Sequence, residues 1–422
     1  MFQSLLTFLK EKILNFMKVS GSFIRNTLKE KILNFKKAFW IFIKNTLKSR
    51  RFWLVAIFGI IALIVYALVT YLPKDSEFIE IYYSRTFYKF ISQVISFMSG
   101  WFTFSLAEIL IVSASIFSMI FLIVAIIKTI RNFAMKYPKP AKPILNFVTY
   151  ALCLSFGLYS CFYILWGFNW KRQMVGKSLG YNMQEVYENE EELKELCKEL
   201  ATEINKLRPL VKENENGVMQ INDSDSKLLE RAYIGYNRLS KKYELFSGIY
   251  GNPKYLLSSK FYCYMKITGV FIPYTFEANV NKYTPDCSKP STVLHEMAHQ
   301  RGFTNEEEAN FIAFLACREH KDIDYRYSGY YMAFIYSMNQ LYSYNSDAYW
   351  EIYSIVCDGY KRDSAASNEF WKQFDNDTVE KVAESTNDSY IKANGDEDGV
   401  HSYGRVVNLL LAERRHRLSN GE

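Results

Sequence analysis

Two histidines and a glutamate lie close together in the sequence His295-Glu296-Met297-Ala298-His299. On an α-helix, residues four apart lie on the same face. Both imidazoles could therefore bind one Zn²⁺ ion, with about 2.0–2.1 Å between the ion and each ring nitrogen. Glu296 would then lie beside a water that the metal activates. This spacing is typical of zinc hydrolases.

The neighbouring residues indicate a short helix that ends soon after His299. Pro290, Ser291 and Thr292 form a helix start with a hydroxyl for the N-cap. Gly302 is the residue type that commonly follows a helix end. The alternative is that both histidines are ordinary helix residues. The glycine and the carboxylates that follow it favour the metal site.

The third ligand is expected in the segment after the glycine. Thr304-Asn305-Glu306-Glu307 fits a capping box, in which Glu307 bonds back to the amide of Thr304. A second helix would then begin at about Asn305, and Glu308 would point inward as the third zinc ligand. A site with three histidines would need a histidine at Asn305, so a His₂Glu site is favoured. The seven cysteines show no CxxC spacing, which argues against thiolate ligands and a disulfide framework.

Three apolar stretches predict transmembrane helices at residues 52–72, 102–127 and 144–168. Each is long enough to cross a bilayer, which requires about 20 residues. Residues 1–51 and the loop 128–143 are rich in Lys and Arg, which places both in the cytoplasm. Residues 73–101 and 169–422 would then be extracytoplasmic. The predicted location is the cell membrane, with a cytoplasmic N-terminus.

The basic segment 1–51 contains a repeat. Residues 9–16 recur at residues 28–35, nineteen positions later. We expect basic amphipathic helices on the anionic inner leaflet. A nucleic-acid-binding arm is the other interpretation of such charge, but the interleaved Phe, Ile and Leu favour lipid. Membrane lipid is therefore the expected partner and nucleic acid is not. Residues 73–101 are expected to form an interfacial helix, because aromatic residues are frequent there.

The segment 169–422 predicts an extracytoplasmic domain that is mainly α, with a small sheet. Residues 188–212 and 224–245 have helical patterns, and residues 261–281 predict one or two short strands. In zinc peptidases, the strand before the motif helix can bind an extended substrate. Glu277, Asn279 and Asn281 alternate and would share one face. They are candidate substrate-binding residues, or they satisfy the ends of neighbouring helices.

The chain resembles a bacterial family of membrane-anchored proteins of unknown function with a zincin-like core. The resemblance is carried by GVFIPYTFEANVN, HEMAHQRGF and EEEANFIAFLAC, and by the later block NDSYIKANGDEDGVHSYGRVVNLLLA. It also extends over the three apolar stretches. It implies a zincin-like domain with His295, His299 and Glu308 as zinc ligands and Glu296 as the base.

These residues predict a membrane-anchored zinc metallopeptidase that acts on peptides or proteins and holds one Zn²⁺ per chain. Glu296 would take a proton from the attacking water and pass it to the leaving amine. Tyr327 and Tyr403 are candidate donors to the oxyanion. A second hypothesis is a zinc-stabilised binding or sensor module at the cell envelope that hydrolyses nothing. An intramembrane protease is disfavoured, because charged residues follow the motif.

Overall fold

The computed structural model describes residues 49–183, 190–221, 224–393 and 404–421. The chain divides into two compact units. One is formed by Met1–Ile64 and Phe121–Gly157, and the other by Val65–Ile120 and Leu158–Glu422. Nearly all of the basic arm predicted at 1–51, with its repeat, lies outside the described residues.

Three helices of the described residues are long and apolar enough to cross a membrane. They are α3 (Arg50–Tyr71), α5 (Leu106–Ala134) and α6 (Lys142–Leu165), with mean hydropathies of 2.8, 2.9 and 1.6. The stretches predicted from sequence correspond to these three helices, although their ends differ. Helix α5 continues past Lys128 and Arg131, because a charged residue ends an apolar stretch without ending the helix.

The segment between α3 and α5 is helical, as expected, but forms two pieces. A π-helix, η1 (Ile79–Tyr88), runs directly into α4 (Lys89–Ser99). One side of this segment is packed inside the second unit, since Tyr88 and Ser92 are fully buried. Phe90 and Trp101 are exposed by 68% and 72%. The segment is therefore two-sided, and its buried side supports the candidate site described below.

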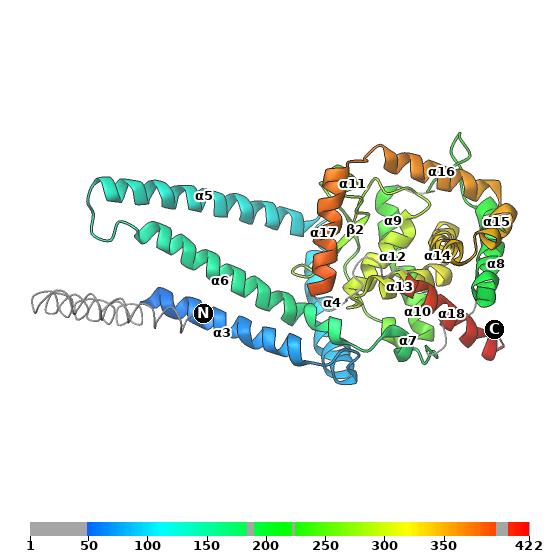
Figure 1. Ribbon diagram of the computed structural model, residues 1–422, viewed down its shortest axis with the longest axis horizontal. Coiled ribbons are helices and arrows are strands. Elements are labelled where there is room, and N and C mark those ends of the chain that lie inside the picture. The colour runs from blue at the N-terminus through cyan, green and yellow to red at the C-terminus, as the bar shows by residue number, and fades with distance from the viewer. Residues whose placement is uncertain (1–48, 184–189, 222–223, 394–403, 422) are drawn as a thin grey trace, which may run out of the picture. The chain divides into compact units, whose positions relative to one another are not determined.

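Most of the second unit is helical. After α6 come the 3₁₀ helix η2 (Gly167–Lys171), α7 (Val175–Ser178), α8 (Glu190–Leu207), the 3₁₀ helix η3 (Arg208–Leu210), α9 (Asp225–Arg231), α10 (Tyr233–Lys242), the 3₁₀ helix η4 (Glu244–Phe246) and α11 (Ser259–Tyr264). They are followed by α12 (Lys289–Gln300), α13 (Glu306–Glu319), α14 (Ile323–Tyr344), α15 (Ser346–Ile355), α16 (Asp358–Lys372), α17 (Asp377–Ala393) and α18 (Gly404–Ser419). Figure 1 shows α12, α13 and α14 close together within this unit.

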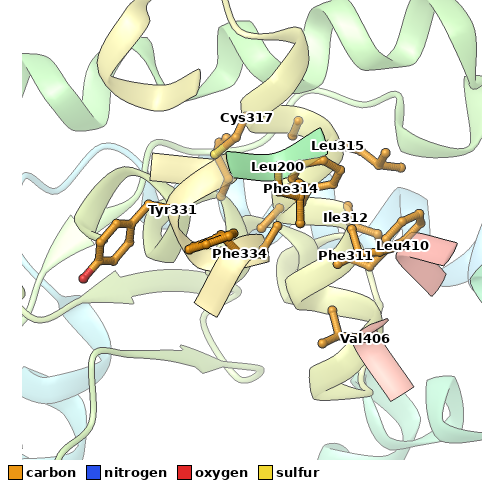
Figure 2. Packing of buried hydrophobic residues seen from close by; sticks show 14 of the residues in the cluster. Leu200, Phe311, Ile312, Phe314, Leu315, Cys317, Tyr331, Phe334, Val406 and Leu410 are labelled. Carbon is orange, nitrogen blue, oxygen red and sulfur yellow. The ribbon is translucent and has the colours of Figure 1, made fainter. Parts of the chain in front are cut away.

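The core of this unit is built around α13. Its side chains from Phe311 to Cys317 are all buried, so the helix is apolar on every side, as expected of a central helix. Helices α10, α12, α14 and α18 pack against it, and Figure 2 shows the side chains that meet there. Helix α8 contributes the apolar stripe predicted from its sequence, since Leu193, Leu196 and Leu200 are buried.

A small sheet lies beside α12. Its strands are β1 (Lys254–Tyr255), β2 (Gly269–Ile272) and β3 (Glu277–Val280), in the order β1-β3-β2. Strand β3 is parallel to β1 and antiparallel to β2, with Gly269 opposite Val280. The sequence predicted one or two strands within 261–281. Two strands are present there, but the first residues of that segment form α11. In the strand order β1-β3-β2, strand β2 lies at one edge of the sheet.

Candidate metal centre

Helix α12 carries both histidines and ends soon after the second one. It begins at Lys289 with Pro290 in its first turn, where the missing amide hydrogen costs nothing. Gly302 has a φ of 86°, which favours glycine. The amides of Gly302 and Phe303 donate to the carbonyls of His299 and Ala298, as in a Schellman motif. This stop turns the chain back toward the histidines, so the first turn of α13 lies beside them.

The structure brings His295, His299 and Glu306 together. The two Nε2 atoms lie 3.1 Å apart. Oε2 of Glu306 is 3.1 Å from Nε2 of His295, and Oε1 is 3.6 Å from Nε2 of His299. One ligand atom from each residue lies within 4.8 Å of the others. Glu306 is the first residue of α13, which explains how a carboxylate seven positions after His299 reaches the pair.

This arrangement fits a zinc ion. Ligands about 2.0–2.1 Å from a tetrahedral ion lie about 3.3 Å from one another. The two Nε2 atoms are 3.1 Å apart, and each has one oxygen of Glu306 at 3.1 Å or 3.6 Å. Two imidazole nitrogens and one carboxylate form a common donor set for zinc. Among the described residues, the cluster has three protein donors and no fourth. Catalytic sites use three protein ligands, whereas structural sites use four.

A second contact fixes the orientation of His299. Its Nδ1 lies 2.6 Å from the carbonyl oxygen of Phe303. Because a carbonyl only accepts, Nδ1 carries a hydrogen, and in the neutral ring Nε2 has its lone pair facing His295 and Glu306. Metal-binding histidines commonly make this kind of contact. The loop after α12 thus both ends the helix and selects the tautomer of His299.

Charges within the cluster act on one another. Burial lowers the pKa of His299, but the neighbouring Glu306 outweighs this effect and raises it to about 9. Burial raises the pKa of Glu306, but His299 and His295 outweigh it and lower it. Without a cation, the cluster therefore favours a charged imidazole beside a carboxylate. A bound cation would compete with the proton on His299.

Glu296 is buried next to this cluster, with 4% of the residue exposed. Burial raises its pKa to about 7, although His295 and His299 lower it. Its Oε2 has no hydrogen-bond partner within the described part of the chain. Strand β2 passes directly beside this carboxylate, since a Cβ atom at Gly269 would collide with it. Glu296 thus has the protonation range of a general base and an oxygen available to accept a hydrogen bond.

Glu308, the expected third ligand, points elsewhere. Its Oε1 accepts a hydrogen bond of 2.6 Å from the amide of Val175, at the start of α7. The structure thus corrects the sequence expectation and places Glu306, not Glu308, beside the histidines. The physical reason is the start of α13. Asn305 is the N-cap residue and makes no side-chain cap, and the Thr304 hydroxyl is buried without a partner in the described residues, so the predicted capping box does not form.

The three candidate substrate-binding residues on β3 and directly after it, Glu277, Asn279 and Asn281, are buried and serve the fold. Glu277 pairs with Lys254 and accepts hydrogen bonds from the amides of Leu106 and Ala107, so it caps the start of α5. Asn279 and Asn281 donate to main-chain oxygens. Glu277 thus satisfies the end of a neighbouring helix, as in the alternative named above, whereas Asn279 and Asn281 bond to the main chain of β3 and of the loop before β2. Strand β2, rather than β3, carries the edge next to Glu296.

Tyr327, one of the two candidate oxyanion donors, is engaged away from the cluster. Tyr327 is fully buried, and its hydroxyl donates to Asp363 at 2.7 Å. Burial is the main cause that raises its pKa well above the usual value. Tyr403 lies outside the described residues. Glu306 is the site residue that sequence reasoning missed, and the signal that could have found it is Asn305, a favourable N-cap residue directly before it.

Segments next to the apolar helices hold the end of α12. The hydroxyl of Tyr88, from η1, donates to the carbonyls of His299 and Gln300. Arg172 follows η2 and donates to the carbonyl of Gly302 at 2.9 Å. Its guanidinium also pairs with Glu80 of η1. These contacts hold the main chain of the turn before Phe303, and the carbonyl of Phe303 orients the ring of His299.

A comparison with known families identifies the family of the chain. The family described as "Protein of unknown function (DUF3810)" matches residues 83–411, and the chain therefore belongs to it. The match begins within η1 and ends within α18, so it includes the metal-centre residues, α5 and α6. The expected membership of a family of unknown function is confirmed. No curated protein and no solved structure matches the chain.

Proposed function

We propose that this protein is a membrane-anchored zinc metallopeptidase. His295, His299 and Glu306 would hold the ion, and Glu296 would act as the general base. The observation that carries this proposal is the convergence of three zinc-type donors beside a buried carboxylate with an unpartnered oxygen. The order of elements also supports a zincin-like core, with a sheet edge, a helix carrying the motif, and a second helix that supplies the carboxylate ligand.

The chain's residues have distinct roles in peptide hydrolysis. A bound zinc ion would polarise the scissile carbonyl and lower the pKa of a water. Glu296 accepts the proton of the attacking water and passes it to the leaving amine. A pKa of about 7 suits both steps, because the group can take and release a proton near neutral pH. His299, held by the carbonyl of Phe303, keeps its nitrogen directed at the centre.

Strand β2 supports a peptide as the substrate. In an antiparallel pair, hydrogen-bonded and non-bonded residue pairs alternate. The amide of Asn281 donates to the carbonyl of Thr268, so the backbone groups of Gly269 and Phe271 point away from β3. No backbone hydrogen bond to either residue on that edge is present in the described residues. An extended peptide could pair with this edge and pass beside Glu296.

The proposed site faces the extracytoplasmic side. The support is the excess of Lys and Arg in residues 128–143, between α5 and α6, which marks a cytoplasmic loop. With α3, α5 and α6 as three crossings, the cluster would lie on the opposite side. In a background without native cysteines, Lys372→Cys should react with an impermeant maleimide in intact cells, and Lys139→Cys only after lysis. The reverse pattern would place the site in the cytoplasm.

The decisive experiment compares the wild type with Glu296→Gln after zinc loading. Both should hold one zinc per chain, and Glu296→Gln should cleave a mixed peptide library about 10²–10⁴-fold more slowly. Glu369→Gln, at an exposed position on α16, is the matched control and should keep full activity. A wild type that holds zinc but cleaves no peptide or envelope protein would favour the non-catalytic binding or sensor module. A wild type without zinc would contradict both.

A further inference from the structure

A cavity of about 140 Å³ opens beside the metal centre. His295 and Glu306 form part of its wall, so anything bound in it would touch the proposed ligands. The other walls come from α13, α14 and α18, and from the polar residues Thr268, Ser291 and Thr292. An apolar cavity of similar size, about 150 Å³, holds a benzene ring. The space beside the centre therefore suits one side chain rather than a whole peptide.

The chemistry of the walls selects against charge. The uncharged polar residues Asn310 and Tyr336 also line the cavity, and its apolar side chains are those of Ala313, Phe314, Met332, Ala333, Val406 and Leu410. Phe314, Val406 and Leu410 belong to the apolar core labelled in Figure 2. Among the described residues, no Lys, Arg or Asp lines the cavity, and its one carboxylate, Glu306, belongs to the metal centre. A charged side chain placed in the cavity would have no oppositely charged partner outside the metal centre and would pay the cost of leaving water.

Small residues make the space. Ala313, Gly329 and Ala333 line it from α13 and α14. At Gly329 the two helices lie so close that a Cβ atom would collide with the side chain of Cys317. Longer side chains at Ala313 or Ala333 would fill the cavity from its wall. The helix contact beneath the cavity is thus tight, while the cavity itself stays open.

We propose that this cavity binds an uncharged apolar side chain, up to the size of phenylalanine, from the substrate residue next to the bond that is cut. The inference rests on the proposed function and adds a substrate class to it: peptides with leucine, isoleucine, methionine or phenylalanine at that position. Glycine at the same position would leave the cavity unfilled. Apolar pockets discriminate by about 10–200-fold for a change of this kind.

Two hydroxamates test the inference by binding, independently of catalysis. The zinc-loaded full chain in detergent would be titrated with the hydroxamates of acetyl-leucine and acetyl-glycine, which share the zinc-binding group. The wild type should bind the leucine compound at least about tenfold more tightly. Ala333→Leu should remove this preference while keeping its zinc and its affinity for the glycine compound. Ser343→Leu, at an exposed position on the same helix, is the matched control and should behave as the wild type.

Met332→Ala provides a second variant, because it enlarges the cavity without adding bulk. It should weaken binding of the leucine compound and leave the glycine compound unchanged. Equal affinity of the wild type for both hydroxamates would overturn the inference, as would a uniform loss of both affinities in Ala333→Leu with zinc still bound. A clear leucine preference in a chain that cleaves no peptide would support the proposed side-chain preference of the cavity and contradict the proposed peptidase function. A chain without bound zinc would contradict both the proposed side-chain preference and the proposed peptidase function.

Discussion

Arg172 forms a buried ion pair with Glu80, with 2.8 Å between Nε of the arginine and Oε2 of the glutamate. Both side chains are less than 5% exposed. Arg172 also donates to the carbonyl of Gly302, the residue at the turn after the histidine helix. The ion pair therefore links two segments adjoining α3 and α6 to the loop that orients His299. It couples the stability of this part of the fold to the geometry of the metal centre.

This ion pair predicts a loss of stability in acid. Burial raises the pKa of Glu80, but the charge and hydrogen bonds of Arg172 outweigh it and hold the pKa below 4.5. A carboxylate with a lowered pKa stabilises the folded state above its unfolded pKa, and this contribution is lost as the pH falls through the folded pKa. We expect the denaturant midpoint, followed by tryptophan fluorescence in detergent, to fall as the pH drops below 4.5.

Glu80→Gln should lower stability at neutral pH and reduce this loss in acid. Glu203→Gln, in a more exposed pair with Lys206, is the matched control and should change stability by less than about 1 kcal/mol. Arg172→Met leaves a buried carboxylate without its main partner and should cost about 3–5 kcal/mol. An acid dependence as steep in Glu80→Gln as in the wild type would mean that other carboxylates cause it.

Variants of Glu306 and Glu308 test which of these two glutamates is the third zinc ligand. Glu306→Ala removes one of three donors and should weaken zinc binding by more than about 100-fold, since the loss of an outer contact alone costs about 10–100-fold. Glu308→Gln keeps its size and a side-chain oxygen for the amide of Val175, and should retain one zinc. Zinc content after dialysis against a weak chelator measures both. Zinc lost in Glu308→Gln and kept in Glu306→Ala would restore the sequence expectation.

The difference between these glutamates shows where sequence reasoning reached its limit. The histidine helix, its glycine stop, the three apolar helices and the stripe of α8 follow from local patterns, and the structure has them. The first turn of α13 depends on one residue of register. The capping pattern of Thr304 and Glu307 and the N-cap propensity of Asn305 give different registers. Tertiary contacts decide between them, because Glu308 binds the amide of Val175, which is 133 positions away.

The roles of Glu277, Asn279 and Tyr327 were beyond local patterns for the same reason. Each was a candidate because its residue type can bind a substrate, and each is occupied by a partner distant in sequence or by the main chain. Glu277 caps α5 from 171 positions away. Tyr327 donates to a carboxylate 36 positions away. The chemistry of a side chain was readable from the sequence, whereas its availability depended on the packing.

A substitution at Gly269 tests how precisely the carboxylate of Glu296 must be positioned. A Cβ atom at this position would collide with the carboxylate of Glu296, so Gly269→Ala must displace that side chain or the strand. A misplacement of about 1 Å can cost about 10²-fold in rate. We expect peptide cleavage to fall by this order while the zinc content stays at one per chain. Val270→Ala, one residue further on β2, is the control and should keep most of the activity. Full activity in Gly269→Ala would argue against Glu296 as the base.

Tyr327→Phe distinguishes a structural tyrosine from an oxyanion donor. The phenol donates to Asp363, a fully buried carboxylate that also pairs with Arg208, so its removal should cost about 1.5–3 kcal/mol of stability. Zinc content and the rate of cleavage at a temperature well below the unfolding transition should stay unchanged, because this hydroxyl is engaged away from the cluster. Measured together, the unfolding midpoint and the cleavage rate separate the two roles. A fall of about 10²-fold in rate with unchanged stability would return Tyr327 to the list of oxyanion donors.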